Sequence, residues 1–302
     1  MLPRRDLAFA LITVFIWGLN FLAMKFAVTE LPPLLLGTLR FTCAALPLVL
    51  LLPRPDLPWR TLLLFGLVQG VLQFGLLFEA LAVGMPAGLA SVVMQTQAFF
   101  TLLLGALWLR EPFAPSQMAG LLVALAGMTC LGLSHGQAMP LIGFLLTIGS
   151  GLAWAVANLL ARRLGQRGQR FPAIQFIAWS SLCAVPPFAL LSLLQEGAQA
   201  WLLVPQLSLR GWASVLFLAW ASTLLAYSLW TTLLSRHPAN RIAPFSLLVP
   251  TLGLASAGLI LDEQPTMPQW LGSGLVLAGL MVNMGLARRR KAADAGEIAV
   301  AD

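Results

Sequence analysis

Three ionisable side chains, Lys25, Arg40 and Glu79, lie within long apolar stretches of the sequence. A charge in an apolar medium is costly unless it is paired or hydrated, so each of them is a candidate for function. The planar guanidinium of Arg40 suits a substrate carboxylate, which it could bind through two hydrogen bonds. Two structural alternatives stay open: Lys25 extends to a nearby interface, and Arg40 pairs with Glu79.

Amide side chains near the middle of two apolar stretches form a second set of candidates. Gln69 and Gln73 are four residues apart and share one helical face, whereas Gln95 and Gln97 lie on different faces. A glutamine amide offers two donors and two acceptors, which suits a zwitterion without adding a charge. The alternative is that these amides only join helices. We expect Gln73 and Gln95 to face a substrate, and Gln97 is a further candidate.

Aromatic and small polar residues near mid-depth could form the wall of a binding pocket. Each half of the chain begins in a similar way, with a tryptophan that is followed by an asparagine three or four residues later. Another pair shares one face of the stretch 211–235, and it includes the single tyrosine of the chain. These candidates are Trp17, Asn20, Trp154, Asn158, Thr223 and Tyr227.

Two prolines, Pro244 and Pro250, lie within the apolar stretch 238–261. Each proline removes a hydrogen bond from a helix and favours a kink. A membrane tolerates such a kink where neighbouring groups or a cavity satisfy the freed carbonyls. Either proline is a candidate gating bend, and a static kink is the alternative.

Signatures of enzymes are missing from the sequence. It holds neither a phosphate-binding GxxxxGK motif nor an HExxH motif, and its two histidines, His135 and His237, fall in loops. ATP is therefore excluded as the direct energy source, and no cofactor or metal is implied. Coupling to protons and facilitated efflux both stay open, because Glu79 is the only acid within an apolar stretch.

The elements that must position these residues are apolar helices. The composition is 59% hydrophobic and 10% charged, with a mean hydropathy of +0.87. Hydrocarbon cannot hydrogen-bond a backbone, so each apolar stretch must be a helix of about 20 residues. The sequence predicts an all-α integral membrane protein with ten spans and no room for a soluble catalytic domain. The predicted spans are 7–27, 33–52, 61–83, 86–109, 115–134, 139–162, 172–194, 211–235, 238–261 and 267–287.

Positive charge is distributed by membrane side. The N-terminus, the loops after spans 2, 4, 6 and 8, and the C-terminal tail hold 15 of the 18 basic residues. Positive loops stay in the cytoplasm, which places both termini inside a bacterial inner membrane. A nucleic-acid binder would instead gather its charge on one solvated face. The 15 residues are Arg4, Arg5, Arg54, Arg60, Arg110, Arg162, Arg163, Arg167, Arg170, Arg236, Arg241, Arg288, Arg289, Arg290 and Lys291.

The chain also repeats itself. A shift of 152 residues aligns Ala87 with Ala239, Leu109 with Leu261, Glu111 with Glu263, Gln117 with Gln269, Gly120 with Gly272, and Ala126-Gly127 with Ala278-Gly279. Each unit holds five spans, an odd number, so the second unit must enter the bilayer from the opposite side. We therefore expect two inverted five-helix repeats, 1–135 and 136–287, followed by a basic, disordered tail at 288–302.

Inverted repeats give two packings of similar energy around a midplane site, which is the architecture of an alternating-access transporter. A channel is disfavoured because the sequence shows no filter-like loop. An integral-membrane enzyme is disfavoured because no cluster of His, Asp or Glu gathers near one face. The expected partners are a small-molecule substrate and the lipid bilayer, without nucleic acid, and the sequence leaves a homodimer open.

Several segments resemble the EamA family of drug/metabolite transporters. They are Trp17-Gly18-x-Asn20-Phe21 with Lys25, Leu39-Arg40-Phe41, and the glutamates Glu111 and Glu263 that follow spans 4 and 9. Longer stretches at 85–91, 95–101, 246–250 and 261–263 are similar to the members that export O-acetylserine and cysteine. The resemblance covers essentially the whole chain. It implies ten helices, cytoplasmic termini and export of small amino-acid metabolites, and Glu79 departs from it, because a small neutral residue is expected there.

Overall fold

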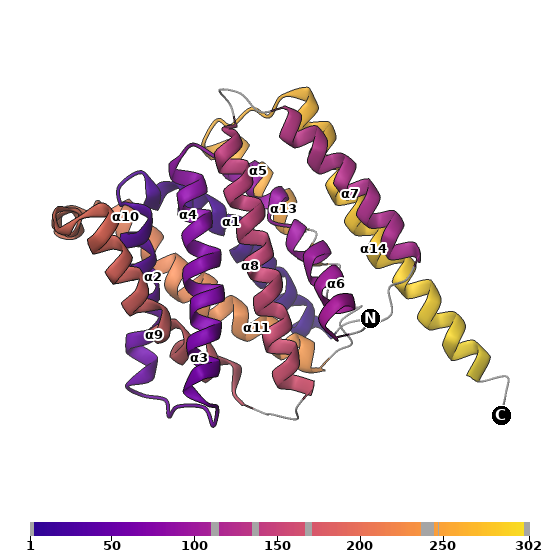
Figure 1. Ribbon diagram of the computed structural model, residues 1–302, viewed down its shortest axis with the longest axis horizontal. Coiled ribbons are helices and arrows are strands. Elements are labelled where there is room, and N and C mark those ends of the chain that lie inside the picture. Colours follow the sequence, from indigo (N-terminus) through magenta and orange to yellow (C-terminus); the bar gives the residue numbers. More distant parts are fainter. Residues whose placement is uncertain are drawn as a thin grey trace.

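The computed structural model describes residues 3–109, 115–134, 139–166, 171–236, 245–246 and 248–298, and every element in these ranges is a helix (Figure 1). The α-helices are α1 (Arg4–Val28), α2 (Pro33–Val49), α3 (Trp59–Phe65), α4 (Gly75–Ala82), α5 (Ala87–Val93), α6 (Thr96–Leu109), α7 (Pro115–Leu133), α8 (Leu141–Gln166), α9 (Ala173–Leu191), α10 (Leu209–Leu216), α11 (Tyr227–Arg236), α13 (Leu248–Ile260) and α14 (Met267–Ile298). Three segments are π-helical, η1 (Gly66–Phe74), η2 (Ser192–Glu196) and η4 (Phe217–Ala226), and η3 (Ala198–Gln206) is a 3₁₀-helix.

The prediction of an all-helical membrane protein is confirmed. Within the described residues, six helical segments are long and apolar enough to cross a bilayer: Arg4–Val28, Trp59–Ala82, Ala87–Trp108, Leu141–Leu164, Ala173–Glu196 and Leu209–Trp230. Four shorter apolar helices lie where the other spans are predicted: Pro33–Leu46, Gln117–Leu133, Leu248–Ile260 and Met267–Val282. The full count of ten spans stays a prediction.

Large apolar side chains lie on the outside of the bundle as well as in its core. Phe78 and Phe188 are fully buried, whereas Leu122 on α7 and Leu259 on α13 are 59% and 84% exposed. In water such a surface would drive aggregation, but in a bilayer it faces lipid tails of the same polarity.

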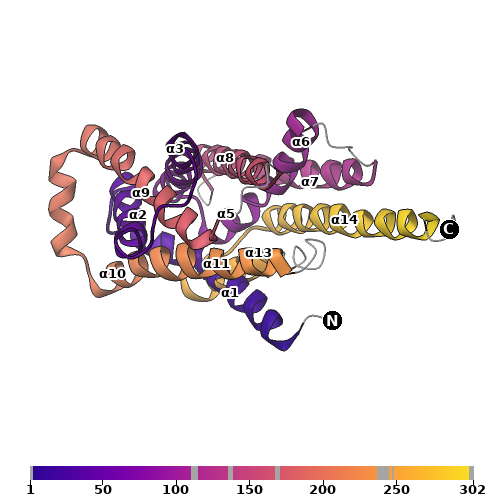
Figure 2. The same cartoon turned by 90° about the horizontal axis from the view of Figure 1, so that it is seen from below.

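Helices α7 and α14 run side by side along one flank of the molecule (Figures 1 and 2). Their contact depends on glycine: a Cβ at Gly127 would lie 2.7 Å from the carbonyl oxygen of Gly272, and one at Gly279 would lie 2.5 Å from that of Gly120. Small residues of this kind let two membrane helices approach closely. The 152-residue shift matches Gly120 with Gly272 and Gly127 with Gly279. In the structure these pairs meet crosswise, because Gly127 lies against Gly272 and Gly279 lies against Gly120.

The π-helical segments η1 and η4 each lie in the middle of a long membrane-crossing helix. Two glycines of η1 fit it closely against α9, because a Cβ at Gly66 would lie 2.5 Å from the carbonyl oxygen of Ser180 and one at Gly70 2.5 Å from Cβ of Ala184. π-Helical turns are rare and occur often at functional sites. Here they carry several of the polar residues described below.

Three elements differ from the sequence-based expectation. The predicted span 86–109 is interrupted at Met94–Gln95, which form a turn between α5 and α6. The predicted loop between spans 7 and 8 contains η3, which runs crosswise to the neighbouring helices (Figure 2). The tail expected to be disordered from residue 288 is helical to Ile298 as a continuation of α14.

Carboxylates join the two halves of the chain at one end of the bundle. Glu196 accepts hydrogen bonds from the backbone N–H groups of Leu34 and Leu35, at 2.7 and 2.9 Å. Glu263 does the same for Ala87 and Gly88, also at 2.7 and 2.9 Å. Each carboxylate thereby satisfies the exposed N–H groups at the start of a helix in the other half.

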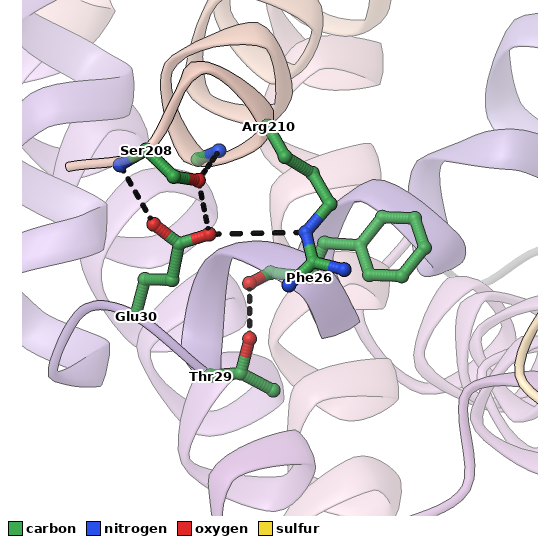
Figure 3. A network of polar contacts seen from close by, with 6 residues as sticks. Phe26, Thr29, Glu30, Ser208 and Arg210 are labelled. Atoms are coloured by element: carbon green, nitrogen blue, oxygen red, sulfur yellow. Dashed lines mark hydrogen bonds and ion pairs between the residues drawn. The ribbon is translucent and has the colours of Figure 1, made fainter.

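Glu30 forms a third link at the same end (Figure 3). Its carboxylate accepts hydrogen bonds from the hydroxyl of Ser208 at 2.6 Å and from the Ser208 backbone N–H at 3.0 Å, and Arg210 lies 3.8 Å away. These hydrogen bonds, helped by the Arg210 charge, hold the pKa of Glu30 below its ordinary value of 4.5. We call this the acidic end, after Glu30, Glu196 and Glu263. The opposite end, where Arg5, Arg54 and Arg163 lie over aromatic rings, is the basic end.

Candidate functional site

A cavity of about 680 Å³ lies between helices of both halves. Nine of the eleven predicted binding residues line it: Trp17, Asn20, Gln73, Gln95, Gln97, Trp154, Asn158, Thr223 and Tyr227. Its described lining contains no Asp, Glu, Lys, Arg or His. The described lining is therefore aromatic and polar without a formal charge.

The cavity extends from the middle of the bundle to the basic end. Phe65 on α3, Ala161 near the end of α8 and Phe171, two residues before α9, lie toward that end and are part of its lining. Toward the acidic end the lining reaches Phe21 and Leu77. The described lining thus extends to the basic end and stops short of the carboxylate links at the acidic end.

One wall combines aromatic rings with a short chain of hydrogen bonds. The ring of Trp17 lies 5.1 Å from that of Tyr227 and 5.3 Å from that of Trp230, centroid to centroid. Trp17 Nε1 donates to the carbonyl oxygen of Ser222 at 3.4 Å, and Gln69 Nε2 donates to the Tyr227 hydroxyl at 3.0 Å. These contacts hold α1, η1, η4 and α11 together around the cavity and fix the orientation of the rings.

The opposite wall depends on the interruption between α5 and α6. Sequence periodicity placed Gln95 and Gln97 on different faces of one helix, but both line the cavity because the turn at Met94–Gln95 breaks that periodicity. Asn158 Nδ2 donates to Gln97 Oε1 at 3.0 Å and to Thr101 Oγ1 at 3.3 Å. Irregular backbone at membrane depth is tolerated where it lines a cavity, and this turn is such a case.

Two amide oxygens of the lining have no hydrogen-bond partner. They are Asn20 Oδ1 and Gln73 Oε1, and both side chains are buried, at 7% and 2% exposure. The Asn20 amide nitrogen contacts the sulfur of Met24 at 3.7 Å. A buried acceptor without a partner is destabilising, so a small movement that brings these oxygens to the N–H donor of a ligand would be favourable.

Arg40 lies behind the cavity wall rather than in it. It is fully buried, its Nε and Nη2 donate to Thr223 Oγ1 at 3.3 and 3.0 Å, and its guanidinium lies 3.8 Å from the centre of the Phe74 ring. Thr223 and Phe74 are lining residues, whereas Arg40 is not. Its Nη1 has no hydrogen-bond partner.

The expected ion pair between Arg40 and Glu79 is not formed. No ion pair within 4.0 Å joins them in the described part of the chain, because the guanidinium is directed to Thr223 and Phe74. Glu79 is half-buried on α4 and does not line the cavity. Lys25 donates to the carbonyl oxygens of Leu81 and Met85, at 3.0 and 3.4 Å, so its ammonium is bound where α4 ends.

The two candidate gating prolines have different outcomes. Pro244 lies outside the described residues. Pro250 is in the first turn of α13, which begins at Leu248, and there the missing N–H of proline costs no intrahelical hydrogen bond. This position gives no reason for a kink. A gating role for Pro250 stays a prediction.

Sequence reasoning missed some residues of the lining. Thr101 and Trp230 are among them, and both follow a predicted site residue at helical spacing, four residues after Gln97 and three after Tyr227. That spacing was the signal that could have identified them. Ser134, which the sequence presents in a GxSxG pattern, donates to the carbonyl oxygen of Leu131 at the end of α7 and is remote from this site.

Residues 5–133 and 141–285 match the EamA-like transporter family. The chain belongs to this family. It is 39% identical over 298 residues to a protein of Escherichia coli (strain K12) named "Probable amino-acid metabolite efflux pump", covering 98% of this chain and 100% of that protein. A Salmonella typhimurium (strain LT2) protein of the same name is 40% identical over 302 residues, with the same coverage.

A solved crystal structure has the same fold. It superposes with a TM-score of 0.65 at 21% sequence identity, over 94% of this chain and 98% of its own. Family membership identifies the chain as a multi-pass membrane transporter and not an enzyme. The cavity is accordingly the candidate site for a transported molecule.

Proposed function

We propose that this EamA-family transporter exports small amino-acid metabolites, O-acetylserine and cysteine among them, across the bacterial inner membrane. The observation that carries the proposal is the uncharged cavity with two unpartnered amide oxygens, Asn20 Oδ1 and Gln73 Oε1. An ammonium group supplies the N–H donors that these oxygens lack, so we expect the ammonium of an amino acid to bind at this part of the lining. The relatives named as amino-acid metabolite efflux pumps support the same substrate class.

We further propose that transport proceeds by alternating access between two inverted five-helix halves, 1–135 and 136–287. The crosswise contact of matched glycines between α7 and α14 supports this, because a two-fold relation between the halves pairs equivalent positions in that way. With ten spans and both termini in the cytoplasm, the basic end is cytoplasmic. The structure then corresponds to the inward-facing state, closed at the acidic end.

Within this proposal the residues have distinct roles. Gln95, at the turn between α5 and α6, and Gln97, fixed by Asn158, offer hydrogen bonds near the middle of the membrane. Trp17, Trp154 and Tyr227 give an aromatic wall against which an apolar or acetylated side chain packs.

A broader metabolite or drug exporter is a second candidate, and the size of the cavity favours it. A volume of about 680 Å³ lies within the range of roughly 300 to 1,000 Å³ typical of sites for drug-sized ligands. A cavity fitted to cysteine alone would be smaller. The two candidates are separated by whether bulky aromatic compounds compete with cysteine for transport.

The test is uptake of labelled cysteine and O-acetylserine into everted membrane vesicles, with and without a proton gradient. Export in the cell corresponds to uptake in these vesicles, and we expect saturable uptake that vesicles without the protein lack. Dependence on the gradient would distinguish proton antiport from facilitated efflux. Absence of uptake of both compounds by well-expressed protein would refute the substrate assignment.

A further inference from the structure

Arg40 carries a charge that no carboxylate in the described part of the chain neutralises. The side chain is fully buried, and Nη1 has no hydrogen-bond partner. Among the described residues, the charge is stabilised by the hydrogen bonds to Thr223 and by three aromatic rings, of which Phe74 is nearest at 3.8 Å, while Phe41 and Phe78 lie at 5.7 and 5.8 Å. A buried cation without a counter-ion is costly, so its presence in a membrane helix requires a compensating role.

Thr223 fixes Arg40 in place, but its hydroxyl has no proton left to donate to a ligand. The Thr223 hydroxyl donates to the carbonyl oxygen of Leu218 at 2.8 Å and accepts from Nε and Nη2 of Arg40. Its single proton is therefore used. What Arg40 supplies to the cavity is its charge.

This charge acts on a cavity whose own surface has none. Arg40 contacts two lining residues, Thr223 and Phe74, and the described lining contains no ionised side chain that would compensate its field. Charge interactions in a poorly polar site are several-fold stronger than in water. A ligand in the cavity therefore experiences a positive potential at the wall formed by Thr223 and Phe74.

We propose that Arg40 makes the cavity selective by charge: it favours ligands that carry a carboxylate, directs that carboxylate to the wall of Thr223 and Phe74, and rejects ligands with a net positive charge. The inference rests on the proposed function and adds a rule for its substrates. Gln73 and Phe74 both line the cavity, and Gln73 Oε1 has no hydrogen-bond partner, so we expect it to receive the ammonium of an amino acid whose carboxylate lies at this wall.

The test compares three ligands that differ only in their charged groups: cysteine, 3-mercaptopropionate, which lacks the ammonium, and cysteamine, which lacks the carboxylate. Their affinities for the purified protein follow from the rise of the unfolding temperature with ligand concentration. For the wild type we expect cysteine to bind at least about 10-fold more tightly than cysteamine, with 3-mercaptopropionate also ahead of cysteamine. In Arg40→Gln this preference disappears.

A matched control is Arg54→Gln, which removes an exposed arginine that lies over the ring of Trp59 at 4.9 Å and outside the described lining of the cavity. It should keep the wild-type preference. Arg40→Lys retains the charge and should retain the order of the three ligands, so loss of that order in folded Arg40→Lys would contradict the charge rule even if Arg40→Gln does not fold. Equal affinity of the wild type for cysteine and cysteamine would overturn the charge rule alone. If none of the three ligands binds, the proposed substrate class is wrong and the charge rule falls with it.

Discussion

The carboxylate of Glu263 binds the backbone N–H of Ala87 at 2.7 Å, although 176 residues separate the two in the chain. A second oxygen of the same carboxylate binds the N–H of Gly88. This contact, and the one between Glu196 and the start of α2, join the two halves of the chain at the acidic end, and the described lining of the cavity reaches the basic end. The proposed alternating access requires the acidic end to open, so we expect these bonds to break during each cycle.

We expect Glu263→Gln to favour the state that is open at the acidic end. The amide keeps one acceptor and loses the charge that the helix N-terminus stabilises. The measurement is labelling of a reporter cysteine, Leu77→Cys, by a membrane-impermeant maleimide added outside intact cells, after Cys43, Cys130 and Cys183 are replaced by alanine. The labelling rate should rise several-fold.

The control for this prediction is Asp262→Asn, a change to the exposed neighbouring acid. It should leave the labelling rate unchanged. An unchanged rate in Glu263→Gln as well would show that the carboxylate contact does not keep the acidic end closed.

Glu30 gives a prediction about pH. Because its pKa is lowered in the folded protein, its contribution to stability is present above the unfolded pKa near 4.5 and is lost as the pH falls through the folded value. We expect Glu30→Gln to melt below the wild type at pH 7, with the difference shrinking as the pH falls from about 5 to 3. Thermal unfolding of both proteins over this range is the check, and a difference independent of pH would contradict it.

Gln95→Leu tests the turn between α5 and α6. The substitution keeps the segment apolar, so abundance should be retained while the apparent affinity for cysteine falls. The loss of one or two hydrogen bonds of about 0.5 to 1.5 kcal/mol each corresponds to a change of roughly 2- to 150-fold. Vesicle uptake kinetics measure it, with Gln206→Leu on η3 as the control because that side chain is exposed and lies outside the cavity. Wild-type kinetics in Gln95→Leu would remove this residue from the site.

The glycine contact between α7 and α14 offers a matched pair of variants. Gly127→Ala places a Cβ 2.7 Å from backbone atoms of α14, whereas a Cβ at Gly274 has nothing within 4 Å. We expect Gly127→Ala to lower stability by about 1 to 3 kcal/mol, as overpacking does. Gly274→Ala should be neutral or stabilising, since alanine is the better helix former. Similar melting temperatures for the two variants would show that α7 and α14 can separate without cost.

The sequence predicted the helical membrane class and most of the lining because both depend on local pattern. Apolar length identifies a span, and a spacing of four residues places Gln69 with Gln73 and Thr223 with Tyr227 on common faces. The turn at Met94–Gln95 could not be predicted, since neither residue is a helix breaker and the interruption depends on packing against α8 and α13.

The position of Arg40 was beyond the sequence for another reason. Charge scarcity identified Lys25, Arg40 and Glu79 as the ionisable residues within apolar stretches, and an ion pair between Arg40 and Glu79 was one alternative because it would neutralise both. The partners found instead are Thr223 and the Phe74 ring, which come from segments distant in sequence. An aromatic ring has no formal charge, so the sequence does not identify it as the partner of a cation. Only the tertiary arrangement of η1, η4 and α2 distinguishes these outcomes.

The number of residues in the π-helical segment η1 determines which of its side chains line the cavity. A π-helical turn holds about one residue more than an α-helical turn, so it accommodates an inserted residue while the helix on either side keeps its orientation. Removal of one residue within Gly66–Phe74 would return the segment to a regular helix, with the residues before and after it still in their places in the bundle. Gain or loss of a single residue at this point would thus change which side chains the segment presents, while the rest of the cavity wall stays as it is.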